Sequence, residues 1–126
     1  MQKLFADEVL IAILYFLPEN KRKFKADREI LHNALFDFKS DYPKIFSEIQ
    51  FRQRYLFYES LSLDQALSNL EATGLLERRN ESPKLYYVSD ELKKAFKTFV
   101  SKRLKECKFN NNLFEEIAGK FIRRCA

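Results

Sequence analysis

The side chains that most often perform catalysis are few in this sequence, and they are not grouped. His32 is the only histidine, and Cys107 and Cys125 do not lie at the spacing of metal ligands or in a nucleophile motif. Gly74 and Gly119, the only two glycines, are too far apart to form a phosphate-binding loop. We therefore expect no enzymatic activity, no metal site and no cofactor.

Basic and aromatic side chains offer a different chemistry, the binding of nucleic acid. The 126 residues include 23 Lys and Arg against 18 Asp and Glu, a net charge of +5, together with 13 Phe and 6 Tyr. The positive charge is concentrated in residues 21–40, with six basic and three acidic side chains, and in residues 101–126, with seven and three. Lys and Arg neutralise phosphates, and aromatic rings stack on bases. This composition permits nucleic-acid binding, although an ordinary solvated surface explains the same clusters.

Composition also limits the class of protein. Apolar residues at 46% rule out a disordered chain, and two Gly with three Pro favour helices over a many-stranded sandwich. Two cysteines are too few for a disulfide scaffold and are typical of a reduced, cytoplasmic protein. The apolar run Val9–Leu17 is shorter than the roughly 20 residues that cross a bilayer, so we expect a buried helix and no membrane contact.

The elements that must position the basic residues begin with two helices. Apolar residues at helical spacing predict a first helix over Ala6–Leu17, ended by Pro18. It is apolar on most sides, which places it in the centre of a core or in an oligomer interface. A basic loop, Glu19–Lys25, follows it. Asp27 is a good N-cap for a second helix, on which His32 is expected to be exposed.

The middle of the chain is less regular. A short helical turn is predicted from Pro43, and alternating aromatic and basic residues predict a strand over Phe51–Tyr58. Ser62 is expected to cap a third helix, which stops at Gly74.

A hairpin follows the third helix. Its predicted strands are Leu75–Arg79 and Lys84–Val88, and the turn residues Asn80–Pro83 join them. The expected fold class is therefore mainly α with a small β-hairpin or sheet.

Two further helices are predicted, one starting at Ser89 or Asp90 and one at Asn112, where Glu115 would complete a capping box. Both carry apolar faces, made of Phe96, Phe99, Val100, Leu104, Leu113, Phe114, Ile117 and Phe121. These faces suit either a homodimer interface or the cover of the chain's own core. We predict one domain over residues 1–126, with a core at about 4–105 and a helical extension at about 106–126.

One local pattern carries a resemblance to a known family. It consists of Leu67, Leu70 and Gly74 with the two leucines that follow, then a charged hairpin, then the segment Leu85–Asp90 that leads into a helix. This pattern resembles the third helix, wing and following helix of winged helix-turn-helix transcription regulators, and the resemblance extends over residues 4 to about 105. It implies a winged helix-turn-helix with extra C-terminal helices.

The resemblance also implies which residues meet DNA. In these regulators the third helix enters the major groove, and the wing contacts the backbone or the minor groove. By position, the groove-facing residues are Ser62, Asp64, Gln65, Ser68 and Asn69. The corresponding wing residues are Arg78, Arg79 and Lys84.

The third helix departs from the family pattern in its charge. Residues 62–73 contain no Lys or Arg, and Asp64 and Glu71 add negative charge that opposes approach to phosphates. The wing, the basic loop and the basic C-terminal helices are therefore better candidates for contact with duplex DNA, although a solvating face is the favoured explanation of the C-terminal residues. Those C-terminal residues are Lys102, Arg103, Lys105, Lys108, Lys120, Arg123 and Arg124. The basic residues of that loop are Lys21, Arg22, Lys23 and Lys25.

Six aromatic residues near these segments have two explanations. They are Phe51, Tyr55, Phe57, Tyr58, Tyr86 and Tyr87. Exposed rings stack on bases, whereas buried rings belong to the core or to an interface. We expect Phe51 and Phe57 in the core, and both explanations stay open for the tyrosines.

Two functions are consistent with these observations. The first is a small cytoplasmic winged-helix protein that binds duplex DNA as a transcriptional regulator, as a dimer. The alternative is a winged-helix protein–protein interaction module or complex subunit without nucleic acid, which the acidic third helix favours.

Overall fold

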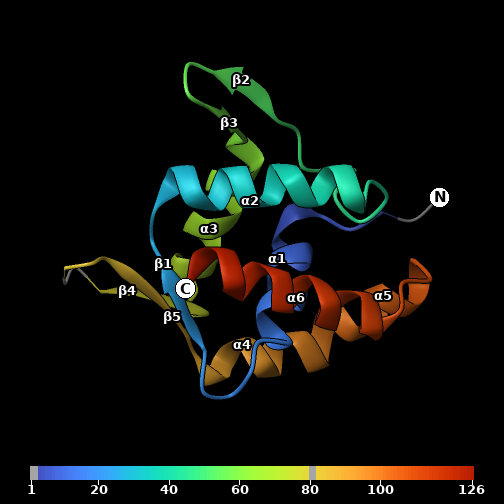
Figure 1. Ribbon diagram of the computed structural model, residues 1–126. Helices are drawn as coiled ribbons and strands as arrows, with labels where there is room; N and C mark the ends of the chain where they lie inside the picture. Colours follow the sequence, from blue (N-terminus) through green and yellow to red (C-terminus); the bar gives the residue numbers. More distant parts are fainter. Residues whose placement is uncertain (1–2, 80–81) are drawn as a thin grey trace.

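The computed structural model describes residues 3–79 and 82–126 (Figure 1). Its helical elements are α1 (Ala6–Tyr15), α2 (Arg28–Asp41), α3 (Leu61–Ala72), α4 (Asp90–Ala95), the π-helical turn η1 (Phe96–Val100), α5 (Ser101–Glu106) and α6 (Asn111–Cys125). Its strands are β1 (Lys23–Lys25), β2 (Arg52–Arg54), β3 (Phe57–Glu59), β4 (Leu76–Arg79) and β5 (Leu85–Val88). The prediction of a mainly helical chain with small antiparallel sheets is confirmed.

Helix α1 lies at the centre of the hydrophobic core. All six side chains from Val9 to Leu14 are buried, and the helix contacts α3, α4, η1 and α6. In Figure 1, α2 and α6 cross in front of α1, while α4, η1 and α5 lie below it. The sequence was consistent with a position for this helix either in the core or in an oligomer interface, and the structure places it in the chain's own core. Within the described residues, no helix has the length and apolarity needed to cross a membrane.

The predicted end of the third helix and start of the hairpin are confirmed at Gly74. Its φ of +79° is the left-handed conformation that glycine adopts without strain. The N–H of Leu75 donates to the carbonyl of Leu70 at 2.9 Å, and the N–H of Gly74 donates to Glu71 at 3.2 Å. These two bonds form a Schellman motif, which satisfies the last carbonyls of α3 and reverses the chain into β4.

The basic loop contains a strand that the sequence did not predict. Lys23–Lys25 pairs antiparallel with β5, and the sheet order is β1–β5–β4. Phe24 is buried and packs edge-on against Phe121 of α6, with ring centroids 5.1 Å apart. A three-residue strand carries too little period-two pattern to be recognised, and its partner lies some 60 residues further along the chain.

The single strand predicted over Phe51–Tyr58 is wrong, because the segment forms the hairpin β2–β3. Tyr55 takes a positive φ of 36°, and the chain reverses there without a glycine to mark the turn. Phe51 packs against the core, as expected, whereas Phe57 is only half-buried.

Before the hairpin, the N–H of Phe46 donates to the carbonyl of Tyr42 at 3.3 Å, a single helical bond in the turn predicted from Pro43.

The residues that cap α2, α3 and α6 all have an extended backbone, and a suitable polar side chain alone does not identify the cap. Asp27 caps α2 as predicted, accepting from the N–H of Ile30 at 3.1 Å. The cap of α3 is Ser60, which has an extended backbone, and the predicted cap Ser62 is already helical. Likewise Asn110 caps α6, so the capping box predicted at Asn112 is wrong.

The apolar faces of the two C-terminal helical segments cover the chain's own core. Six of the eight predicted residues are buried: Phe96, Val100, Leu104, Phe114, Ile117 and Phe121. Leu113 lies at the boundary of exposure, and Phe99 is 69% exposed because it lies in the π-helical turn η1, where the helical spacing changes. A homodimer through these faces stays a prediction, now with Phe99 as its main exposed apolar residue.

Replacing Gly74 by Ala is expected to lower the free energy of unfolding by about 1 kcal/mol, because an L-residue is strained at this φ. No atom lies within 4 Å of the added Cβ, so steric overlap does not contribute. Gly119→Ala is the matched control: the site is also open but lies inside α6, and the helix should gain up to about 1 kcal/mol. Urea unfolding measures both changes, and equal signs for the two variants would contradict the assignment of the Gly74 turn.

Candidate nucleic-acid interface

The three-stranded sheet brings the predicted wing and the predicted basic loop onto one surface. Lys23 lies opposite Tyr87, and Lys25 lies opposite Leu85 on β5. On the other side of β5, Glu77 pairs with Tyr87 and Arg79 pairs with Leu85. Because alternate residues of a strand share a face, these side chains point away from the core, whereas the intervening side chains of β1 and β5 are buried. We call this surface the basic sheet face: Lys23, Lys25, Glu77, Arg79, Leu85 and Tyr87.

Tyr87 lies at the centre of the basic sheet face, between basic side chains from both outer strands. The guanidinium carbon of Arg79 lies 3.8 Å from the centre of the Tyr87 ring, and the Nζ of Lys23 lies 6.0 Å from it. The Arg79 contact is a close cation–π interaction, which holds the guanidinium flat over the ring. Arg79 also forms an ion pair of 3.4 Å with Glu77. The Tyr87 ring therefore holds basic side chains in place on this face, and such side chains can bind phosphate oxygens.

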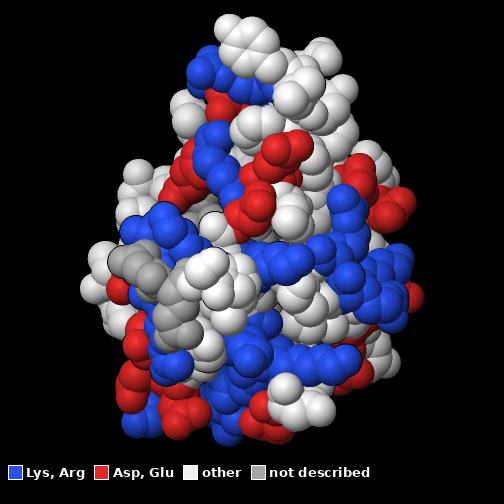
Figure 2. Space-filling model, turned by 60° about the vertical axis from the view of Figure 1, so that its left-hand side comes forward, with Lys and Arg blue, Asp and Glu red and all other residues white. Residues whose placement is uncertain are grey.

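The other predicted loop and wing residues differ in their exposure and in their partners within the chain. Lys21 and Lys84 are exposed, just before β1 and just before β5. Arg22 is half-buried: its Nη2 donates to the carbonyl of Ser89 at 3.2 Å, and its Nη1 lies 3.6 Å from Asp90. Arg22 therefore ties β1 to the start of α4. Figure 2 shows the side of the molecule that carries the sheet, where Lys and Arg predominate across the centre and lower half.

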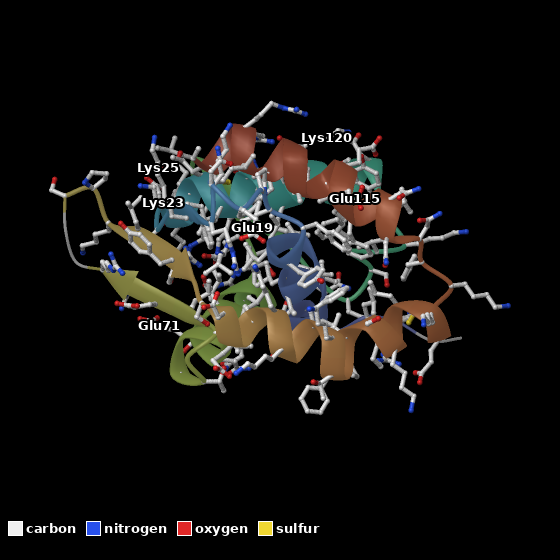
Figure 3. The ribbon with its side chains drawn as sticks, turned by 90° about the horizontal axis from the view of Figure 1, so that it is seen from below. Glu19, Lys23, Lys25, Glu71, Glu115 and Lys120 are labelled. Atoms are coloured by element: carbon white, nitrogen blue, oxygen red, sulfur yellow. The ribbon has the colours of Figure 1, made fainter. Side chains whose placement is uncertain are left out.

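Arg78 lies on the opposite face of β4 from Arg79 and points toward α3. It forms an ion pair of 3.2 Å with Glu71 at the C-terminal end of that helix. Seen from below, Lys23 and Lys25 lie at the β1 edge of the sheet and Glu71 lies beyond its β4 edge (Figure 3). The two wing arginines that the sequence grouped thus serve different surfaces.

The four polar residues predicted on the third helix lie on two different stripes. Ser62, Gln65 and Asn69 share one stripe, and Gln65 donates to Asn69 at 2.9 Å, while Asn69 donates to Asp7 of α1 at 3.3 Å. Ser68 lies on the other stripe and lines a cavity of about 310 Å³ with Asp64, between α2, α3 and the sheet. Of the residues predicted to face the groove, Ser68 and Asp64 thus join Arg28 and Arg78 in that cavity.

Both carboxylates of α3 are ion-paired within the chain. Arg28 of α2 binds Asp64 through Nε and Nη2, at 3.0 Å and 2.6 Å, and also reaches Glu59 at 2.9 Å. Arg78 neutralises Glu71. The negative charge of α3, which opposes its contact with DNA phosphates, is therefore compensated by arginines of the same chain. Arg28 has no local sequence signal for this role, because Glu59 and Asp64 are 31 and 36 residues away.

The prediction that His32 is exposed is wrong, since the side chain is completely buried. Its Nδ1 accepts from the backbone N–H of Ser60 at 3.0 Å, and its Nε2 lies 2.8 Å from Oδ1 of Asp64. Because Nδ1 accepts, the ring proton of the neutral imidazole lies on Nε2 and is donated to Asp64. Both ring nitrogens are satisfied, which allows a polar side chain on the buried face of α2.

The environment of this cluster shifts several pKa values. Burial lowers the pKa of His32, in spite of the attraction of Asp64 for a proton on the ring. Burial opposes the ionised form of Asp64, but the hydrogen bond from Arg28 and the neighbouring His32 together lower its pKa. Hydrogen bonds from Arg28 and then Arg52 lower the pKa of Glu59. At neutral pH the cluster therefore holds two carboxylates and an uncharged imidazole.

The lowered pKa of His32 predicts a stability that falls as the pH is lowered from about 6.5, the ordinary pKa of histidine. Below that pH the unfolded chain binds a proton that the folded chain excludes, at a cost of up to about 1.4 kcal/mol per pH unit. Urea unfolding between pH 7.5 and 5.5 measures this loss. His32→Gln should have lower stability and a flat pH profile in that range, since the chain has no other histidine. If the free energy of unfolding of His32→Gln depends on pH as strongly as that of the natural chain, a group other than His32 is responsible for the pH dependence.

Across residues 3–79 and 82–126, no group of three His, Cys, Asp or Glu side chains could hold a metal ion. The main features are the basic sheet face and, between the sheet and α3, a cavity lined by arginines. No family model, no curated protein and no solved structure matches this chain.

Proposed function

We propose that this chain is a winged-helix domain that binds duplex DNA and acts as a transcriptional regulator. The observation that carries the proposal is the pairing of β1 with β5, which places Lys23 and Lys25 beside Arg79 around Tyr87. The basic sheet face is the phosphate-binding surface in this proposal.

The order of the elements supports the winged-helix part of the proposal. Three helices, with a short strand between the first and second, are followed by a two-stranded hairpin. The short strand β1 joins the hairpin on the β5 side and completes a small antiparallel sheet. This is the arrangement expected when a wing follows the third helix, here with the extra hairpin β2–β3 inserted between α2 and α3.

The distribution of charge supports DNA as the ligand. Lys23, Lys25 and Arg79 with one Glu77 leave a net charge of +2 on the basic sheet face, and Lys21 and Lys84 adjoin it. DNA phosphates attract such a surface, and each neutralised phosphate releases a condensed counterion. Compensation of Asp64 and Glu71 by arginines lowers the repulsion between α3 and a nearby duplex.

Removing two charges from this face is expected to change the salt dependence of binding. In Lys23→Ala/Lys25→Ala the slope of log K against log salt should become shallower by about 1.8, since each phosphate contact contributes about 0.9. Fluorescence anisotropy of a labelled 20-base-pair duplex over a range of salt concentrations measures this slope. Both lysines are exposed, so the fold should be retained.

The matched control is Lys102→Ala/Lys105→Ala, which removes the same charge from exposed positions on α5. It should leave the slope unchanged. If both double variants reduce the slope equally, binding depends on net charge alone and the basic sheet face has no special role.

The second candidate is a winged-helix protein–protein interaction module without nucleic acid. The observation that favours it is the intramolecular pairing on α3, where Gln65, Asn69 and both carboxylates already have partners. Undetectable duplex binding at low salt would select this candidate over the first.

A further inference from the structure

The hairpin β2–β3 presents the most exposed large apolar side chains among the described residues. Tyr55 is 94% exposed and Leu56 is 88% exposed, and both lie at the turn that joins the two strands. Figure 1 shows the hairpin projecting from the top of the molecule, away from the helices. Exposed apolar side chains at the end of an arm are typical of a contact surface.

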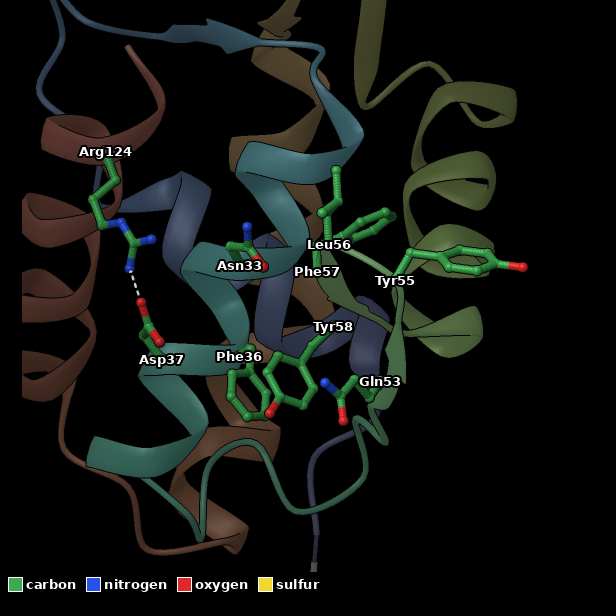
Figure 4. Close-up of a pocket in the computed structure, with 9 residues that line it drawn as sticks. All are labelled: Asn33, Phe36, Asp37, Gln53, Tyr55, Leu56, Phe57, Tyr58 and Arg124. Atoms are coloured by element: carbon green, nitrogen blue, oxygen red, sulfur yellow. Dashed lines mark hydrogen bonds and ion pairs between the residues drawn. The ribbon is translucent and has the colours of Figure 1, made fainter.

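The base of the hairpin is firmly packed, so the arm has a defined direction. Tyr58 stacks on Phe36 of α2, with ring centroids 3.8 Å apart and an angle of 6° between the planes. Phe51 packs edge-on against the same Phe36 ring at 5.5 Å. In Figure 4, Phe36 and Tyr58 lie together beside α2, while the Tyr55 ring points away from them. A tip held in this way loses little conformational entropy when it binds.

A buried carboxylate adds to this support. Glu59, at the end of β3, is only 4% exposed and receives Arg28 from α2 and Arg52 from β2. Arg54 also approaches it, with Nε 3.6 Å from Oε1. Since Arg52 and Arg54 both face Glu59 through Nε, their Nη groups remain available to another acceptor.

Charge and position distinguish among the possible partners of the tip. The side chains of Arg52 and Arg54 are 58% and 52% exposed and directly precede the tip, and with Arg28 they outnumber Glu59 and Asp64. The guanidinium of Arg54 lies 5.9 Å from the Tyr55 ring, the same pair of groups as Arg79 with Tyr87 on the basic sheet face. In Figure 2, Lys and Arg side chains lie near the top of the molecule, and acidic side chains separate them from the larger group of basic side chains in the centre and lower half.

We propose that the hairpin β2–β3 is a second DNA contact, in which Tyr55 and Leu56 enter the minor groove while Arg52 and Arg54 bind the flanking phosphates. The inference rests on the proposed function, because it requires that the chain bind duplex DNA. Apolar wedges beside arginines are the groups by which proteins enter the minor groove and part base steps. The hairpin leads directly into the N-cap of α3, and the wing leaves the other end of that helix, so the two contacts flank α3.

A single tryptophan placed at the tip tests the contact directly, because the natural chain has none. Tyr55→Trp keeps an aromatic ring at the tip, and its fluorescence is expected to fall on addition of duplex DNA, at the same midpoint as the anisotropy of the labelled duplex. Phe5→Trp is the control, at a ring that is 66% exposed just before α1, and its fluorescence should not change.

The results separate the two proposals. Rising anisotropy with a constant Tyr55→Trp signal would overturn the hairpin contact and leave DNA binding intact. The absence of any anisotropy change at low salt would overturn the proposed function and the hairpin contact with it, leaving a protein partner as the explanation of the exposed tip.

A second variant measures the strength of the contact. Tyr55→Ser/Leu56→Ser should weaken duplex binding about tenfold, which corresponds to the loss of one stacked or inserted ring. Its salt slope should equal that of the natural chain, because no charge is removed. Phe5→Ser is the control for the loss of an exposed apolar side chain. An unchanged Kd for the double variant would contradict the proposal.

Discussion

Arg28 joins three segments whose relative positions determine both proposed DNA contacts. Its guanidinium bridges Glu59 at the end of the hairpin and Asp64 in the first turn of α3. Glu59 has little solvent exposure, so a loss of its arginine partners would leave the carboxylate without compensation. The hairpin therefore cannot swing away from α2 without exposing or unpairing this charge. His32 adds to the constraint, since it binds the backbone of Ser60 and the same Asp64.

Ion pairs within the fold determine which of the basic side chains counted along the sequence remain available at the surface. Counted by sequence, residues 61–80 carry a net charge of −1 and the wing contributes two equivalent arginines. In space, Arg78 compensates Glu71 while Arg79 stacks on Tyr87, so only one wing arginine belongs to the basic sheet face. Arg22 similarly serves as a structural link to α4. The lysines of β1 retain an exposed surface, which makes them the main contributors to the proposed phosphate binding.

Much of the fold is predictable from local signals, and most of the site is not. Asp27, the leucines of α3 and Gly74 each act within a few residues, so the start of α2, the end of α3 and the hairpin strands can be recognised from the sequence. The partners of Phe24, His32 and Arg28 lie about 30 to 100 residues away. Such contacts depend on how the elements pack, and no spacing along the chain indicates them.

The strand β1 also bears on the behaviour of the folded protein at high concentration. It is an outer strand of its sheet, and an outer strand offers backbone groups to which another chain can pair. Here it is only three residues long, and Lys23 and Lys25 stand on either side of the buried Phe24. Two such edges brought together would place four ammonium groups in close proximity. The lysines that form the proposed phosphate-binding surface thus also keep one copy of the sheet from extending into the next.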